Sequence, residues 1–199
     1  QVDAKQPSLV SDFEKSTNGW APLPSPEAML VQLAPGGASG RCLKVTAPFS
    51  GGDMVVMAGL KEFDPLKLGK LSFDYKLDPR AKVNLYAKVG ATTYYALLLS
   101  APENPGEGIK PLGTISNVAA DNQWHHAEFD LAAAVRAAFP NRTEVRLTNL
   151  SFAGPRDGEY LRAGFGGNYF GTSFCLDNVR LTAAPGTTIE ELTAVAGVG

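Results

Sequence analysis

The 199-residue chain contains only two cysteines, Cys42 and Cys175, and only two histidines, His125 and His126. Two cysteines are too few for a disulfide scaffold, and no CxxC pair with zinc spacing is present. They are interpreted either as half-buried free thiols or as one bridge between neighbouring strands, if the geometry allows it. The histidines are adjacent, so on a strand they would point to opposite faces and could not share one metal ion or one substrate.

The chain also lacks an excess of one charge and a long apolar run. Its 18 Lys and Arg against 20 Asp and Glu give a net charge of -2. This leaves no basic field for a phosphate backbone, so nucleic acid is not expected as a partner. The longest apolar run, residues 94–99, is far shorter than the roughly 20 residues of a membrane span.

Sequence motifs of several enzyme classes are missing as well. The chain has no Walker A loop, no GxSxG elbow and no HExxH motif. It starts at Gln1 without the basic and apolar regions of a signal peptide, and it is interpreted as a processed chain or a piece of a larger protein.

Turn residues are plentiful, with 21 Gly and 14 Pro, and they disfavour a helical bundle. Between the turns, apolar and polar residues alternate with the period of a strand. Asp130 is expected to cap a short helix over residues 131–139, which Pro140 ends. Residues 20–35 are interpreted as extended loop and edge structure, and residues 101–117 as a long loop. The segments interpreted as strands are 11–14, 42–46, 54–60, 71–77, 83–89, 92–100, 124–131, 145–153 and 174–181.

This order of strands and turns predicts an all-β fold, an antiparallel β-sandwich with one short helix. The expected organisation is a lead-in over residues 1–10, the sandwich over 11–184 and a linker-like tail over 185–199.

The sequence Asp12-Phe13-Glu14 is a candidate for metal binding. On a strand, the two acids would project together while Phe13 enters the core. Oxygen ligands at this spacing suit calcium, which takes 6–8 oxygens, backbone carbonyls included. If the first and last strands are neighbours, Asp177 could complete the site, with carbonyls from the turn at residues 37–41. Alternatively, these acids are surface charges at strand ends or turn caps.

A predicted hairpin over residues 83–100 offers a ligand site. A two-residue turn at Gly90-Ala91 would pair Val89 with Thr92, and Tyr86 would then face Tyr95. Paired rings can stack on the apolar face of a sugar, while amides and amines bond its hydroxyls. The alternative is an ordinary cross-strand aromatic pair or a second core layer, and a loop of different length would reverse the faces. The predicted ligand-binding residues are Tyr86, Tyr95, Asn84 and Lys88.

Four segments together resemble a carbohydrate-binding-module-like jelly roll of the galactose-binding-domain-like superfamily. They are residues 12–20, 40–45, 123–131 and 171–181. The last segment, with Phe174-Cys175-Leu176-Asp177-Asn178-Val179, is the most specific of the four.

The resemblance implies a jelly-roll sandwich with a structural calcium near the first and last strands. The implied ligands are the carboxylates of Asp12 or Glu14 and of Asp177, with a carbonyl near Gly40 or Arg41. The resemblance does not fix the ligand site. Some members bind glycans on the concave sheet, which favours the two tyrosines, and others use loops at one end, here residues 49–54, 102–117 and 154–171.

We therefore expect a non-catalytic carbohydrate-binding module of a larger secreted or cell-surface bacterial protein, with polysaccharide or oligosaccharide as its ligand and a structural calcium. Its other partners would be further domains of the same parent chain. The alternative is a structural or protein-interaction sandwich. A third hypothesis is a jelly-roll polysaccharide-degrading enzyme, which needs two carboxylates, or a Tyr/His pair, in one cleft.

Overall fold

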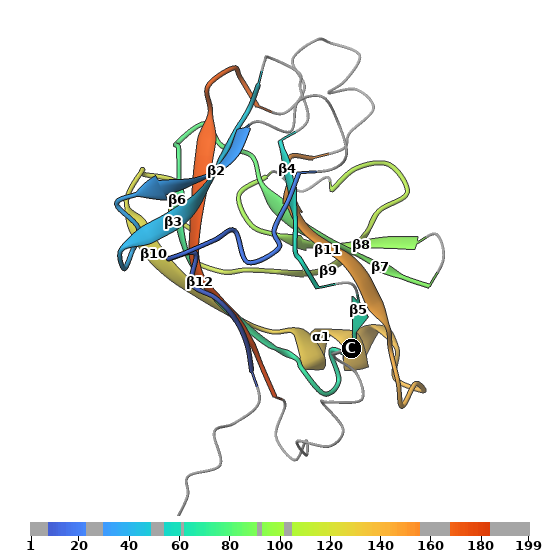
Figure 1. Cartoon of the computed structure of the whole chain (residues 1–199). Coiled ribbons are helices and arrows are strands. Elements are labelled where there is room, and N and C mark those ends of the chain that lie inside the picture. Colours follow the sequence, from blue (N-terminus) through green and yellow to red (C-terminus); the bar gives the residue numbers. More distant parts are fainter. Residues whose placement is uncertain are drawn as a thin grey trace, which may run out of the picture.

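The computed structural model describes residues 8–22, 30–48, 54–60, 62–90, 93–101, 105–155 and 168–183. These residues form two six-stranded sheets that face each other, together with one helix (Figure 1). The predicted all-β sandwich with one short helix is confirmed. In the described part of the chain, no helix is long and apolar enough to cross a membrane.

The first sheet is antiparallel throughout and joins the beginning of the chain to its last strand. Its strand β1 pairs with β12 beside the main path of the sheet. Strand β2 lies at the edge, as expected for a proline-rich region, because proline cannot donate a ladder hydrogen bond. In order across the sheet, the strands are β10 (Trp124–Asp130), β6 (Lys70–Leu77), β12 (Ser173–Thr182), β3 (Arg41–Thr46) and β2 (Val31–Pro35), with β1 (Ser8–Ser11) on β12.

The second sheet carries the predicted hairpin. In order, its strands are β4 (Val55–Met57), β11 (Leu147–Ala153), β7 (Asn84–Val89), β8 (Thr93–Leu98) and β9 (Lys110–Thr114), with β5 (Glu62–Phe63) on β11. Strand β9 is parallel to β8. The prediction of a loop throughout residues 101–117 is therefore wrong. The edge of the sheet tolerates Pro111 in β9, although proline and glycine lower its strand propensity.

Helix α1 (Leu131–Ala138) begins as predicted. The Asp130 carboxylate accepts a hydrogen bond of 2.9 Å from the backbone N–H of Ala133. Its buried side chains are Leu131, Ala132 and Val135, so one face of this short helix packs on the sandwich. The predicted N-cap is confirmed.

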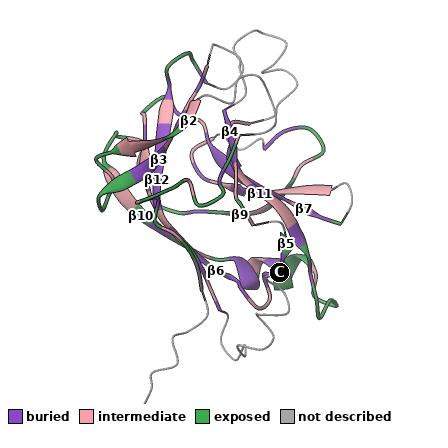
Figure 2. Cartoon of the chain, in the orientation of Figure 1, coloured by how far each residue is buried: buried purple, intermediate pink, exposed green. Residues whose placement is uncertain are grey.

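Aromatic side chains fill the centre of the core between the sheets. Strands of both layers carry buried residues (Figure 2). The ring of Phe152 on β11 lies 5.2 Å from Phe73 and 5.9 Å from Trp20, centroid to centroid. Phe174 on β12 lies 6.3 Å from the same ring. Phe152 thus connects the two sheets through three aromatic neighbours.

The predicted strand over residues 11–14 is wrong. Strand β1 ends at Ser11, and Phe13 has a positive φ of 54°, which lies outside the β region. The Phe13 side chain is nevertheless fully buried in the core, and its N–H donates to Asn18 Oδ1 at 3.1 Å. Strand β1 begins at Ser8, inside the predicted lead-in, and the predicted tail lies outside the described residues.

Candidate functional site

The β7–β8 hairpin has a different register from the predicted one. Val89 pairs with Thr93, one residue further along than expected, and Tyr86 lies opposite Ala96. A shift of one residue moves every side chain of β8 to the other face of the sheet. The prediction that Tyr86 and Tyr95 lie side by side is therefore wrong.

Tyr95 belongs to the interior of the sandwich. It pairs with Ala87, whose side chain faces the core, and packs against the main core cluster. Its ring lies 5.5 Å from that of Phe139 in an edge-to-face arrangement. Tyr95 thus supports the end of helix α1 and does not share a surface with Tyr86.

Asn84 and Tyr86 lie on the outer face of the second sheet, where they are covered. Asn84 is fully buried. Its side-chain oxygen accepts a hydrogen bond of 3.0 Å from the N–H of Leu99, and its amide nitrogen donates one of 3.3 Å to the Tyr86 hydroxyl. The Tyr86 hydroxyl donates a hydrogen bond of 3.0 Å to the backbone carbonyl of Pro105. Contrary to the prediction, these two residues are placed to hold the strand and loop together, beneath the surface that a ligand would touch.

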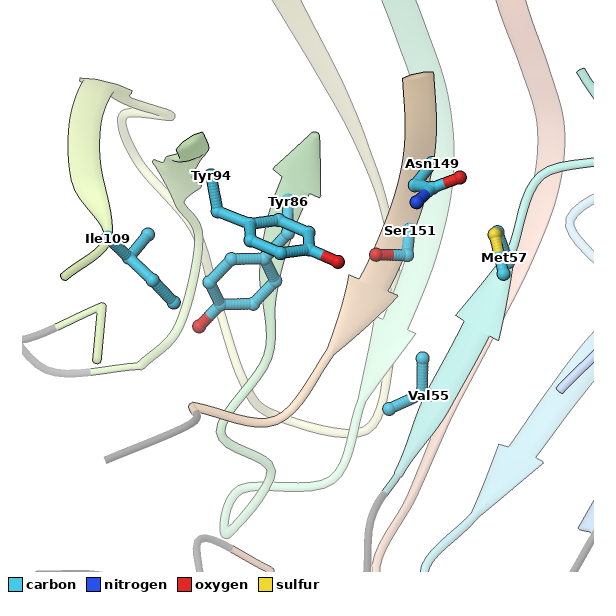
Figure 3. A pocket seen from close by; sticks show the side chains of 7 residues that line it. All are labelled: Val55, Met57, Tyr86, Tyr94, Ile109, Asn149 and Ser151. Carbon is cyan, nitrogen blue, oxygen red and sulfur yellow. The ribbon is translucent and has the colours of Figure 1, made fainter. Parts of the chain in front are cut away.

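The corrected register places Tyr94 on this outer face, beside a shallow depression (Figure 3). The volume of the depression is about 30 Å³, so a ligand would lie across it and not inside it. Tyr86 is in its floor, whereas Tyr94 is only partly buried. We call this feature the Tyr94 depression; its lining residues are Val55, Met57, Tyr86, Tyr94, Ile109, Asn149 and Ser151.

Polar groups surround the exposed part of the Tyr94 ring. Lys88, a predicted ligand residue, pairs with Tyr94, and its ammonium nitrogen lies 4.8 Å from the ring centroid. Asn149 has a φ of 54° and sits where the register of β11 shifts between Thr148 and Ser151. Such a bulge redirects a side chain, here to the rim of the depression. An aromatic ring, an amide, a hydroxyl and an ammonium group therefore meet around one surface.

A second depression is larger, about 320 Å³, and opens beside β1. Its polar side chains already make hydrogen bonds within the protein. Ser11 Oγ accepts one of 3.0 Å from the Trp20 indole N–H, and Asn18 Oδ1 accepts one from the backbone N–H of Phe13. It therefore suits a hydroxyl-rich ligand less well than the Tyr94 depression. The lining is mostly apolar: Val10, Ser11, Asn18, Trp20, Ala58, Gly59, Leu60, Leu150, Val179 and Leu181.

Two of the predicted metal ligands meet at the turn of residues 36–40. The Glu14 carboxylate accepts a hydrogen bond of 3.3 Å from the backbone N–H of Arg41, and Asp177 Oδ2 accepts one of 2.9 Å from the backbone N–H of Ser39. A Cβ atom added to Gly37 would lie 2.5 Å from the Arg41 carbonyl oxygen and 2.9 Å from Asp177 Oδ2. These two oxygens thus flank one point of the turn.

The Asp12 carboxylate does not join those of Glu14 and Asp177, because its Oδ1 accepts a hydrogen bond of 3.3 Å from the backbone N–H of Glu14 in a local turn. Among the residues that the structure describes, no group of three or more His, Cys, Asp or Glu side chains could hold a metal ion. Two carboxylates and one carbonyl still form a set of oxygen donors, the kind that calcium prefers.

The electrostatics of Asp177 are compatible with a cation nearby. Burial raises the pKa of this carboxyl group, and the backbone N–H groups of Ser39 and Asn178 oppose that effect. The charges of Asp74 and Glu14 raise the Asp177 pKa further. A bound cation would relieve this repulsion.

The two histidines point to opposite faces of β10, as predicted. His125 packs on the core-facing Tyr75, with 5.7 Å between ring centroids. On the outer face, His126 Nδ1 lies 2.7 Å from Asp74 Oδ1, and this contact is the largest cause of the raised pKa of His126.

Of the loops considered as an alternative ligand site, residues 49–53, 102–104 and 156–167 lie outside the described part of the chain. The described end of the last loop exposes Tyr169 and Phe170, at 54% and 70%.

Comparisons with known proteins found similar folds only. No family model and no curated protein matches the chain. It is similar to the CBM22-1–GH10 modules of a Clostridium thermocellum endo-1,4-β-D-xylanase complexed with xylohexaose, at 12% identity and a TM-score of 0.44. The match covers 90% of this chain and 29% of that one.

It is also similar to the family 11 carbohydrate-binding module of the Clostridium thermocellum cellulase Lic26A-Cel5E, at 13% identity and a TM-score of 0.43, over 91% and 97% of the two chains. The same family 11 module in complex with a β-1,3-1,4-mixed-linked tetrasaccharide gives 13% identity and a TM-score of 0.42, over 91% and 98%. At this level of identity, the similarity does not assign a ligand to this chain.

Proposed function

We propose that the chain is a non-catalytic carbohydrate-binding module that holds a polysaccharide or oligosaccharide across the Tyr94 depression. The observation that carries this proposal is the Tyr94 ring on an outer sheet face, with Lys88, Asn149 and Ser151 around it. The proposal includes a place in a larger secreted or cell-surface protein, to which the module would supply the contact with a glycan.

Each group has a role in this binding mode. The ring of Tyr94 would pack against the apolar CH face of one sugar unit, while Tyr86 supports it from the floor. The Asn149 amide, the Ser151 hydroxyl and the Lys88 ammonium can bond sugar hydroxyls. Because the depression is shallow, little of the ligand surface is buried and the affinity is expected to be weak.

Affinity electrophoresis of the chain against soluble xylan, mixed-linked β-glucan, glucomannan and pectin tests the proposal. We expect retardation by at least one polysaccharide and a loss of affinity of about 10-fold or more in Tyr94→Ala, since an aromatic contact contributes roughly 1 kcal/mol beyond its buried area. The matched control is Tyr169→Ala, because Tyr169 is also exposed but does not line the depression.

Four results would contradict the proposal. Retardation by none of the polysaccharides would remove glycan binding, and equal binding by Tyr94→Ala and the parent would remove this site. Loss of binding in Tyr169→Ala alone would place the ligand at the loop end of the sandwich. Release of reducing ends from a bound polysaccharide would show catalysis and overturn the non-catalytic part.

We also propose that calcium binds between the carboxylates of Glu14 and Asp177 and the carbonyl of Arg41, where it would tie the start of the chain to its last strand. Support comes from the two carboxylates at one turn and the raised pKa of Asp177. Calcium at 100 times its Kd would stabilise the fold by about 2.7 kcal/mol. For a domain of this size, that corresponds to a Tm increase of roughly 5–10 °C.

The measurement is a thermal melt in calcium and in chelator. Glu14→Gln should abolish the difference in Tm, whereas Asp12→Asn should keep it, because the Asp12 carboxylate is engaged in its own turn. An identical Tm of the parent chain in both conditions would refute calcium binding. A loss of the difference in Asp12→Asn would show that Asp12 is a ligand after all.

A further inference from the structure

A cationic side chain lies against the ring of Tyr94. Lys88 is opposite Tyr94 in the register of β7 and β8, so both side chains project from the outer face of the second sheet. The Lys88 ammonium nitrogen lies 4.8 Å from the centroid of the Tyr94 ring, within the range of a cation–π contact. This contact holds a positive charge beside the ring against which a sugar unit would pack.

None of the described carboxylates neutralises the charge of Lys88. Across the described ranges of the chain, the ion pairs join other groups, and no Asp or Glu lines the depression. On β11, Lys88 lies opposite the uncharged Thr148. Glu62 follows on β5, opposite Thr148, but its carboxylate lies 3.6 Å from the guanidinium group of Arg146. An anionic group at the depression would therefore meet the Lys88 ammonium without repulsion from a lining carboxylate.

A similar contact on the first sheet has different surroundings. Lys76 on β6 lies opposite Trp124, and its ammonium nitrogen is 5.7 Å from the centroid of that ring. Asp74 is two residues from Lys76 on the same strand, so it shares the outer face, and Asp177 lies opposite Asp74. Two carboxylates thus lie in the row next to Lys76, where they would repel an anion.

We propose that the Tyr94 depression selects acidic glycans, so that its preferred polysaccharides contain uronic acids. This inference rests on the proposed glycan site and adds the chemical class of the ligand. A uronic acid keeps the apolar CH face of a pyranose and carries a carboxylate on the same ring. The CH face would pack against Tyr94, and the carboxylate would accept a charge-assisted hydrogen bond from Lys88.

A carboxylate gains more from Lys88 than a sugar hydroxyl does, because Coulomb attraction adds to the hydrogen bond. The contact with the Tyr94 ring already restricts the lysine side chain, so less conformational entropy is lost when the ion pair forms. The ion pair stays in contact with solvent, so its contribution is modest. We expect an affinity about 3- to 5-fold higher for the acidic glycan, and salt should screen this difference.

The test is isothermal titration calorimetry of the full chain with two matched pairs of oligosaccharides, in low and in high sodium chloride. The first pair is an oligogalacturonide and its methyl ester, and the second is xylotetraose with and without a glucuronic acid branch. In at least one pair, the acidic member should bind about 3- to 5-fold more tightly in low salt. High salt and Lys88→Gln should each abolish the difference, whereas the matched control Lys76→Gln should keep it.

The outcomes separate this inference from the proposed function. Equal or weaker binding of the acidic member in both pairs, or binding of neutral β-glucan alone, would overturn the selection of acidic glycans and leave a glycan site. A preference that persists in Lys88→Gln or disappears in Lys76→Gln would overturn the role of Lys88. Binding of no oligosaccharide or polysaccharide would overturn the proposed function as well. The titrations of the parent chain decide the preference even if Lys88→Gln fails to fold.

Discussion

Phe152→Ala is expected to lower the free energy of unfolding by about 3–5 kcal/mol, the usual cost of truncating a fully buried phenylalanine. The exposed fraction of Phe152 is 0%, and its ring contacts Trp20, Phe73 and Phe174. These neighbours come from two strands of the opposite sheet and from the segment after β1, so they cannot easily close the cavity together. The measurement is urea unfolding followed by tryptophan fluorescence, with Trp20 as a reporter beside the mutated ring.

Phe170→Ala is the matched control, because it removes the same side chain at a position that is 70% exposed. Its effect should stay within about 0.5 kcal/mol, as for most surface substitutions. A loss of less than 1 kcal/mol in Phe152→Ala, or equal losses in both variants, would show that the two sheets do not depend on this aromatic centre.

Asn84→Ala is expected to cost about 2–3 kcal/mol, although it removes only one small polar group. The substitution leaves the buried N–H of Leu99 without its acceptor and removes the amide that donates to the Tyr86 hydroxyl. A buried donor without a partner costs about 1–3 kcal/mol, to which the lost packing adds. The measurement is again the free energy of unfolding in urea.

An exposed asparagine provides the comparison for this variant. Asn141→Ala, in the turn after helix α1, should change the stability by less than about 0.5 kcal/mol. If Asn84→Ala is equally mild, Asn84 does not fix the hairpin to its loop. That result would favour the prediction from the sequence that Asn84 is a ligand-binding residue.

The comparison between sequence and structure is most instructive at the hairpin. Alternation in residues 83–89 correctly predicted which side chains of β7 face the core, because burial requires the period of two. It could not predict the register, since a turn with one more residue satisfies the same alternation in β8. The dipeptide Tyr94-Tyr95 places one ring on each face in either register, so an outward tyrosine was predictable but its number was not.

The first acidic segment shows a similar limit. The burial of Phe13 followed from its hydrophobicity, but the left-handed backbone that achieves it has no signal in the sequence. Because Phe13 is not in a strand, the side chains of Asp12 and Glu14 diverge, one toward a local turn and one toward Arg41. Strand β9 was missed for another reason: its parallel partner β8 supplies the pairing that its own composition does not favour.

The pairing of β1 with β12 has a mechanical consequence. Ser8 lies opposite Thr182, and Ser11 lies opposite Val179, so the chain enters and leaves the sandwich at the same end. A pulling force applied through residues 8 and 182 would act across this ladder and open its hydrogen bonds one after another, as in a zipper. Bonds that open in sequence resist less force than bonds sheared together. Under tension, β1 would therefore peel away first, before the force reached the aromatic core behind it.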